Sequence, residues 1–155
     1  MRWFGEAMST LLSMKAAGKL SAADLLSGAD FTSSKQPYGL SEVFNSAYFV
    51  MYDPNQYQGL TSADKAKFDA GRALAATIGS SGYRQVVLSE NIFRRESDSW
   101  FWQSKVNIDT AGQLVHEMFH VAGFSDNLFG WFKVNGKSLN DSIHEHCGIT
   151  GATMR

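Results

Sequence analysis

Two histidines four residues apart, with a glutamate beside the first, are the residues of this sequence best suited to metal chemistry. They are His116, Glu117 and His120, in the segment TAGQLVHEMFHVAGFSD. Residues four apart lie on one face of a helix, so both imidazoles can point at one metal ion. Glu117 follows His116 directly and can reach a water molecule on that metal. The spacing therefore predicts a zinc site with two nitrogen ligands and a general base.

A third ligand is available in the residues that follow. Gly123 can end the helix in a left-handed turn, which allows the chain to bring Asp126 back toward the metal. The alternative third ligand is Glu145, which lies 25 residues after His120 (145 − 120). We favour Asp126 because the turn at Gly123 explains how it reaches the site.

The flanks of the motif predict the helix that carries it. Thr110 and Gln113 have the spacing of a capping box at a helix start. Asp109 adds negative charge where the helix dipole favours it. An apolar face is expected to pack on a core while the histidines face a cleft, and it consists of Val115, Phe119 and Ala122.

The motif and its extension together read HExxHxxGxxD, from His116 to Asp126. This pattern resembles the signature of the metzincin zinc peptidases, in the aspartate variant of snapalysin-like secreted bacterial enzymes. It is also similar to uncharacterised bacterial zincin-like domains. The resemblance covers this helix and its turn. It implies a small zincin-like fold, one Zn²⁺ ion held by His116, His120 and Asp126, Glu117 as general base, and a secreted or cell-surface location.

Several other residues have a possible role in chemistry and an ordinary structural one. His144, Glu145 and His146 are expected at the solvated end of a helix, where histidines suit the dipole. Cys147 is expected to be a small buried hydrophobe rather than a thiolate ligand. Metzincins place a methionine beneath the metal, but Met154 lies one residue from the chain end and is not assigned that role. Trp100, Phe101 and Trp102 are expected mostly in the core, with a substrate pocket as the alternative.

Composition limits the possible classes of protein. The chain has 155 residues, 44% of them hydrophobic, which fits one globular domain spanning residues 1–155. A net charge of −1 gives no reason to expect nucleic acid or an anionic membrane as partner. One cysteine excludes an internal disulfide framework. Glu6 and Lys15 interrupt the N-terminal apolar stretch, so no signal peptide is predicted. No run is long enough to cross a membrane, and we expect a soluble monomer that acts on a peptide or protein.

Periodicity along the chain predicts an α+β domain with a few strands and with helices packed on one side. Strands are predicted at Ala47–Tyr52 and Tyr83–Ser89. Helices are predicted at Trp3–Met14, from Ser21, from Thr61 or Ser62 to about Ile78 with Gly79 as stop, at Asn127–Lys133, and from Ser138 to His146 with Gly148 as stop. Loops or turns are predicted at Phe31–Tyr38, across most of Asn91–Asn107, and at Val134–Gly136.

The function that these predictions favour is zinc-dependent hydrolysis of peptide bonds, with an extended substrate paired to the edge of the Tyr83–Ser89 strand. A gluzincin-like peptidase that uses Glu145 as third ligand is an alternative. A zinc-binding interaction or delivery domain without hydrolysis is another. The presence of Glu117 disfavours this non-hydrolytic alternative, because a purely structural zinc site needs no base.

Overall fold

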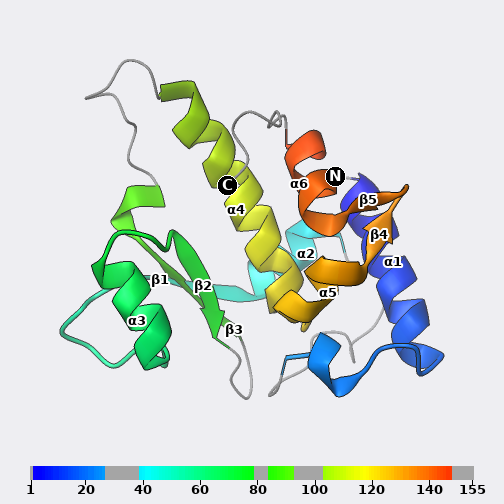
Figure 1. The fold of residues 1–155 in the computed structure, drawn as a ribbon, viewed down its shortest axis with the longest axis horizontal. Coiled ribbons are helices and arrows are strands. Elements are labelled where there is room, and N and C mark those ends of the chain that lie inside the picture. The colour runs from blue at the N-terminus through cyan, green and yellow to red at the C-terminus, as the bar shows by residue number, and fades with distance from the viewer. Residues whose placement is uncertain (1, 27–38, 79–83, 93–102, 148–155) are drawn as a thin grey trace.

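A long helix, α4 (Gln103–Val121), runs through the middle of the protein and separates a sheet from the C-terminal elements (Figure 1). The computed structural model describes residues 2–26, 39–78, 84–92 and 103–147, with only the backbone described at 84, 91 and 103–110. Helix α4 contacts the sheet on one side and helices α2 (Leu40–Ser46) and α6 (Leu139–His146) on others. The motif His116–His120 therefore lies between the sheet and the C-terminal elements.

Three strands form the sheet, in the order β1 (Ala47–Met51), β3 (Arg84–Leu88) and β2 (Ala75–Ile78). β3 pairs parallel with β1 and antiparallel with β2. The predicted strands are confirmed, but β3 is central, and both of its edges are already paired. The predicted pairing of a substrate with the edge of this strand is therefore wrong. The strands on the outside of this sheet are β1 and β2.

The strand β2 lies where the sequence pattern predicts helix. Helix α3 (Ser62–Asp69) begins as predicted, with the Thr61 hydroxyl accepting from the Asp64 N–H, but it ends before Ile78. Gly71 has φ 70°, its N–H donates to the Phe68 carbonyl, and the Arg72 N–H donates to the Lys67 carbonyl. These two bonds form a Schellman motif, which ends the helix. The chain is then free to pair as β2 with β3.

Helix α4 begins earlier than predicted, at Gln103 rather than near Thr110. Thr110 and Asp109 therefore lie inside the helix, and the predicted capping box and dipole contact at its start are wrong. Residues Gln103–Asn107 were expected as part of a long loop, and Ser104 and Asn107 have low helix propensity. The helical backbone at these residues shows that this local preference is overridden.

The remaining elements mostly follow the sequence pattern. α1 (Arg2–Ala16) is confirmed, while the helix expected from Ser21 is a single 3₁₀ turn, η1 (Ala22–Asp24), and a further 3₁₀ turn, η3, spans Glu90–Ile92. α5 (Asp126–Trp131) is followed by the hairpin of β4 (Lys133–Val134) and β5 (Lys137–Ser138). Asn135 and Gly136 have φ 51° and 79°, which suits a two-residue hairpin turn. Ser138 caps α6 as predicted. The segment Phe31–Tyr38 and the stops at Gly79 and Gly148 lie outside the described residues.

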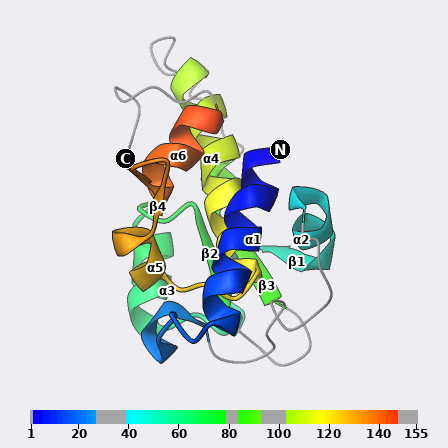
Figure 2. The same ribbon diagram turned by 90° about the vertical axis from the view of Figure 1, so that its right-hand side faces the viewer.

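One hydrophobic cluster joins these elements. α1 buries Phe4, Met8 and Leu11 at helical spacing, and it lies in front of α4 in the view of Figure 2. The ring of Phe4 packs on that of Phe119 in α4, with centroids 4.7 Å apart. On the central strand, Val86 and Leu88 enter this cluster, while Val87 points to the other face and is also fully buried. The central strand is thus buried on both faces of the sheet. In the portion of the chain described here, no helix has the length and apolar character needed to cross a bilayer.

Candidate metal centre

The turn after α4 brings Asp126 back beside the motif histidines. Gly123 has φ 109°, its N–H donates to the His120 carbonyl, and the Phe124 N–H donates to the Phe119 carbonyl. These are the two bonds of a Schellman motif, with glycine at the position that needs positive φ. α5 starts at Asp126, so the acidic side chain stands in the first turn of a new helix. The predicted glycine stop is confirmed, and the apolar face of Val115, Phe119 and Ala122 is buried as expected.

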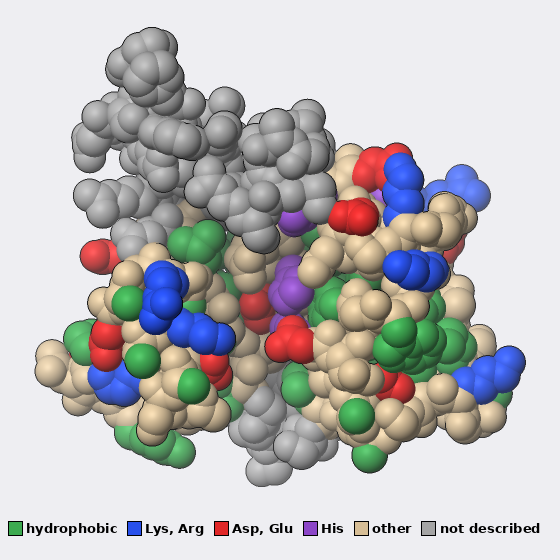
Figure 3. All heavy atoms as spheres, in the orientation of Figure 1, with side chains coloured by type: hydrophobic (Ala, Val, Ile, Leu, Met, Phe, Trp, Pro, Cys, Tyr) green, Lys and Arg blue, Asp and Glu red, His purple; other side chains and the backbone are tan. Residues whose placement is uncertain are grey.

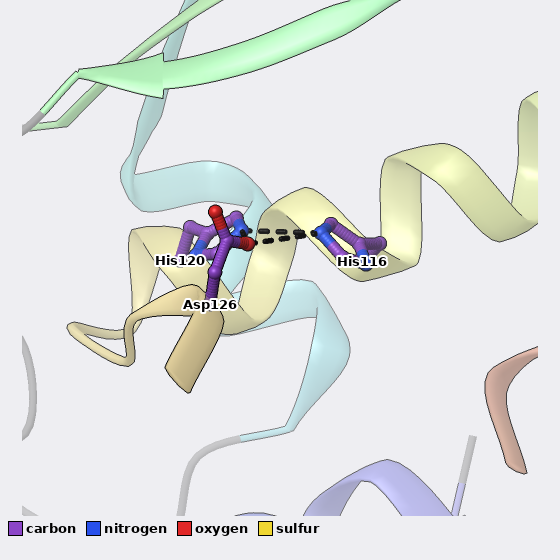
Figure 4. A group of neighbouring side chains, drawn as sticks. All are labelled: His116, His120 and Asp126. Atoms are coloured by element: carbon purple, nitrogen blue, oxygen red, sulfur yellow. Dashed lines mark hydrogen bonds and ion pairs between the residues drawn. The ribbon is translucent and has the colours of Figure 1, made fainter. Parts of the chain in front are cut away.

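His116, His120 and Asp126 converge on one point (Figure 4). The Nε2 atoms of the two histidines are 3.1 Å apart. Asp126 Oδ1 lies 3.0 Å from His120 Nε2 and 3.8 Å from His116 Nε2. Tetrahedral zinc with bonds of about 2.0–2.1 Å holds its ligand atoms roughly 3.4 Å apart. The three separations therefore fit a single zinc ion.

Both imidazole rings are held so that Nε2, not Nδ1, faces this point. His120 Nδ1 lies 2.7 Å from the Phe124 carbonyl oxygen, an atom that can only accept a hydrogen bond. His116 Nδ1 lies 2.9 Å from Asn140 Oδ1 on α6. With Nδ1–H donating in each ring, the neutral imidazoles carry their lone pairs on Nε2. Such outer partners are the usual way in which a protein orients histidine ligands.

The charges where His116, His120 and Asp126 converge favour a proton or a metal cation between the three side chains. Two Nε2 lone pairs at 3.1 Å repel each other unless a proton or a cation lies among them. Burial alone would lower the pKa of His120, but Asp126 and the charge of Glu117 outweigh burial and raise it. The rings of His116 and His120 hold the pKa of Asp126 far below its ordinary value. Asp126 is therefore ionised, and the donor set of two imidazoles and a carboxylate suits Zn²⁺.

The site is closed on one side and open on the other. The side chains of His116 and His120 are 21% and 10% exposed, while that of Asp126 is 86% exposed. Phe129 stacks on the His116 ring with centroids 4.2 Å apart and forms part of the closed side. Figure 3 shows histidine and acidic side chains gathered on one face, between the sheet and the C-terminal elements. Three protein ligands with an open side are typical of catalytic rather than structural zinc sites.

Glu117 lies beside the histidines but has partners of its own. It is 3% exposed. Its Oε2 accepts a hydrogen bond from Thr77 Oγ1 at 2.5 Å, and its Oε1 accepts one from Gln113 Nε2 at 3.2 Å. Thr77 belongs to β2, so the outer strand of the sheet contacts the glutamate of the motif directly. Glu117 is thus oriented by a strand and by its own helix.

The other sequence candidates on α6 lie away from this point. Glu145 is paired with Lys137 at 2.7 Å and is not part of the ligand group found among the described residues. His146 is exposed and its ring stacks on Trp3 with centroids 4.8 Å apart. His144 is half-buried, unlike the solvated helix end that was expected. Cys147 is half-buried against the core, and burial raises the pKa of its thiol, which disfavours a thiolate ligand.

The sequence pattern did not indicate two residues that orient the site, Thr77 and Asn140. Thr77 was assigned to a helix, and Asn140 carried no local signal because its partner His116 lies 24 positions earlier in the chain. Trp100, Phe101, Trp102 and Met154 lie outside the described residues.

Comparisons of the chain with protein-family models, with curated proteins and with solved structures find no match. We therefore infer function from the residues and their geometry.

Proposed function

We propose that the chain is a zinc-dependent endopeptidase of zincin-like fold, with one Zn²⁺ ion held by His116, His120 and Asp126. The observation that carries the proposal is the convergence of these three side chains, with ligand atoms within 4.8 Å of one another and Nε2 of both histidines turned inward. The sequence HExxHxxGxxD, which resembles the metzincin signature, supports it.

The chemistry divides between the ion and the chain. When bound, zinc lowers the pKa of its water to about 7 and polarises the substrate carbonyl. Glu117, next to His116, takes the proton of the attacking water and later passes it to the leaving amine. Thr77 and Gln113 hold its carboxylate by one oxygen each while it does so. The Nδ1–H groups of His116 and His120 donate to Asn140 Oδ1 and to the Phe124 carbonyl, which leaves Nε2 of each ring to bind the metal.

An extended substrate would lie along β2 rather than along β3. Among the residues that the structure describes, β2 pairs with β3 alone, and its Thr77 contacts the motif glutamate. The unpaired backbone groups of an outer strand can bind a peptide by adding a strand to the sheet. A peptide held there would pass the open side of the three ligands.

A second candidate is a zinc-binding domain without hydrolysis. The observation in its favour is the burial of Glu117, whose two carboxylate oxygens both accept hydrogen bonds from side chains. Each oxygen can still accept a second hydrogen bond, but the buried carboxylate must be reached by a water molecule before it acts as a base. Metal binding is common to both candidates, and hydrolysis distinguishes them.

The test combines metal analysis with an assay on an unfolded, fluorescently quenched protein substrate. Wild type should contain about one zinc per chain, as a three-ligand site implies. H116A and H120A should lose the zinc, whereas the control H146A, a histidine outside the ligand group, should retain it. E117Q should retain zinc and lose activity by a factor of roughly 10² or more, because the amide cannot act as a base. Equal activity of E117Q and wild type would contradict the enzyme proposal. One zinc per chain in the double variant H116A/H120A would show that these histidines do not form the zinc site.

A further inference from the structure

Asp24, about a hundred residues before the motif in the chain, is a buried carboxylate with a full set of hydrogen bonds. It is 4% exposed. Its Oδ2 accepts from the Ser21 N–H at 2.8 Å and from Ser21 Oγ at 3.1 Å. Its Oδ1 accepts from Asn127 Nδ2 at 2.5 Å and from Trp131 Nε1 at 2.8 Å. One oxygen therefore stabilises the turn η1, and the other holds α5.

The two donors to Oδ1, Asn127 and Trp131, are separated by one helical turn of α5. Asn127 and Trp131 are four residues apart and so lie on one face of this helix. Asn127 directly follows Asp126. A buried hydrogen bond to a charged group contributes more than a neutral one, so this contact orients the short helix that carries Asp126.

The backbone of the same N-terminal segment holds the chain just before Asp126. The Ser125 N–H donates to the Asp24 carbonyl at 2.9 Å, and the Leu26 N–H donates to the Gly123 carbonyl at 2.8 Å. Leu25 and Phe124 form a β-bridge. Asp24 thus contacts the residue before Asp126 through its backbone and the residue after it through its side chain.

Local geometry alone does not explain why Asp126 stays beside the histidines. Its side chain is 86% exposed, and α5 has six residues, too few for a helix that is stable by itself. Leu128 and Phe129 anchor α5 in the core. Asp24 adds a second anchor through Asn127 and Trp131, and two anchors fix the direction in which the first turn points.

We propose that Asp24 is a positioning residue of the metal centre, so that the zinc affinity of the C-terminal motif depends on the N-terminal segment Asp24–Leu26. This inference rests on the proposed zinc site at His116, His120 and Asp126. Asp24 does not contact the metal. It acts through Asn127, Trp131 and Ser125 on the position of Asp126.

The test removes only the donors to Oδ1 and measures zinc affinity by competition with a chromogenic chelator. The double variant N127A/W131F loses both donors while residue 131 stays aromatic. Zinc affinity should fall about 10- to 100-fold, the usual effect of removing an outer partner of a metal ligand. S21A is the matched control on the same carboxylate, because it removes one donor to the other oxygen. It should retain wild-type affinity.

A second control separates positioning from general loss of stability. T61A removes the hydroxyl that caps α3, away from the site, and lowers stability without touching α5. If N127A/W131F loses no more zinc affinity than T61A, measured on folded protein, the role of Asp24 is overturned while the zinc site stands. If wild type itself does not bind zinc, the proposed function falls as well. A loss of affinity confined to N127A/W131F supports the inference.

Discussion

The hydroxyl of Thr77 lies 2.5 Å from Oε2 of Glu117, which connects the outer strand β2 to the glutamate of the HExxH motif. The two residues are 40 positions apart in the chain. The carboxylate proposed as the general base is therefore oriented from the sheet as well as from its own helix, where Gln113 holds the other oxygen. This relationship leads to the first prediction.

Thr77→Val should lower kcat on a peptide substrate by about 10- to 100-fold, since a hydrogen bond to a charged group contributes about 1.5–3 kcal/mol. Zinc affinity should not change, because Thr77 does not contact the ligands. Thr77→Ser should restore the rate. Thr10→Val, which removes a threonine hydroxyl from the exposed face of α1, is the control. A kcat for Thr77→Val equal to that of the control would show that the contact does not serve the base.

Asp126→Ala should lose zinc at chelator concentrations where Glu145→Ala keeps it. Asp126 Oδ1 lies among the Nε2 atoms of both histidines, whereas Glu145 pairs with Lys137 on the surface. Removing a ligand weakens binding more than the ~10–100-fold typical of an outer partner. Equilibrium dialysis against zinc, with a competing chelator, gives the order. The reverse order would favour the gluzincin-like alternative.

Gly123→Ala should destabilise the protein and weaken zinc binding together. At φ 109° a β-carbon is strained, at a cost of about 1–3 kcal/mol, and relief of the strain moves the turn that carries Asp126. Thermal unfolding and zinc titration measure the two effects.

Gly18→Ala is the matched control for this variant. Gly18 has φ 70° and ends α1 with the same pair of Schellman bonds, far from the motif in the chain. It should lose stability and keep its zinc affinity. Equal loss of zinc affinity in both variants would mean that the turn at Gly123 has no special role.

The stability of the metal-free protein should depend on Asp24 at acid pH. Burial alone would raise the pKa of Asp24, but hydrogen bonds from Trp131, Ser21 and Asn127 outweigh burial and lower it. A depressed pKa in the folded state stabilises the fold above the unfolded value of about 3.9. That stabilisation is lost as the pH falls through the folded pKa. Urea unfolding of wild type and D24N in chelator should show a difference that is constant above about pH 5 and shrinks below about pH 4. A difference that does not change with pH would contradict this assignment.

Local sequence determined the elements whose signals lie within a few residues of one another. Helical spacing placed His116 and His120 on one face, and Gly123 ended the helix because only glycine accepts its backbone conformation without strain. The connection that brings Asp126 back consists of residues 122–125 alone, so the ligand group could be inferred from one segment. The cap at Ser138 and the turn at Asn135–Gly136 are local in the same sense.

Tertiary structure decided the contacts between segments that are distant in the chain. Ala75–Ile78 is a strand because its backbone groups pair with β3, and that partner outweighs a helical pattern of apolar residues. Thr77 reaches Glu117, Asn140 reaches His116 and Asp24 reaches Trp131 across separations of 40, 24 and 107 residues. No spacing rule encodes such pairs, because each depends on the packing of elements whose order in space the local sequence does not specify. Local sequence thus brought the three proposed ligands near one another, while long-range packing selected the side chains that orient them.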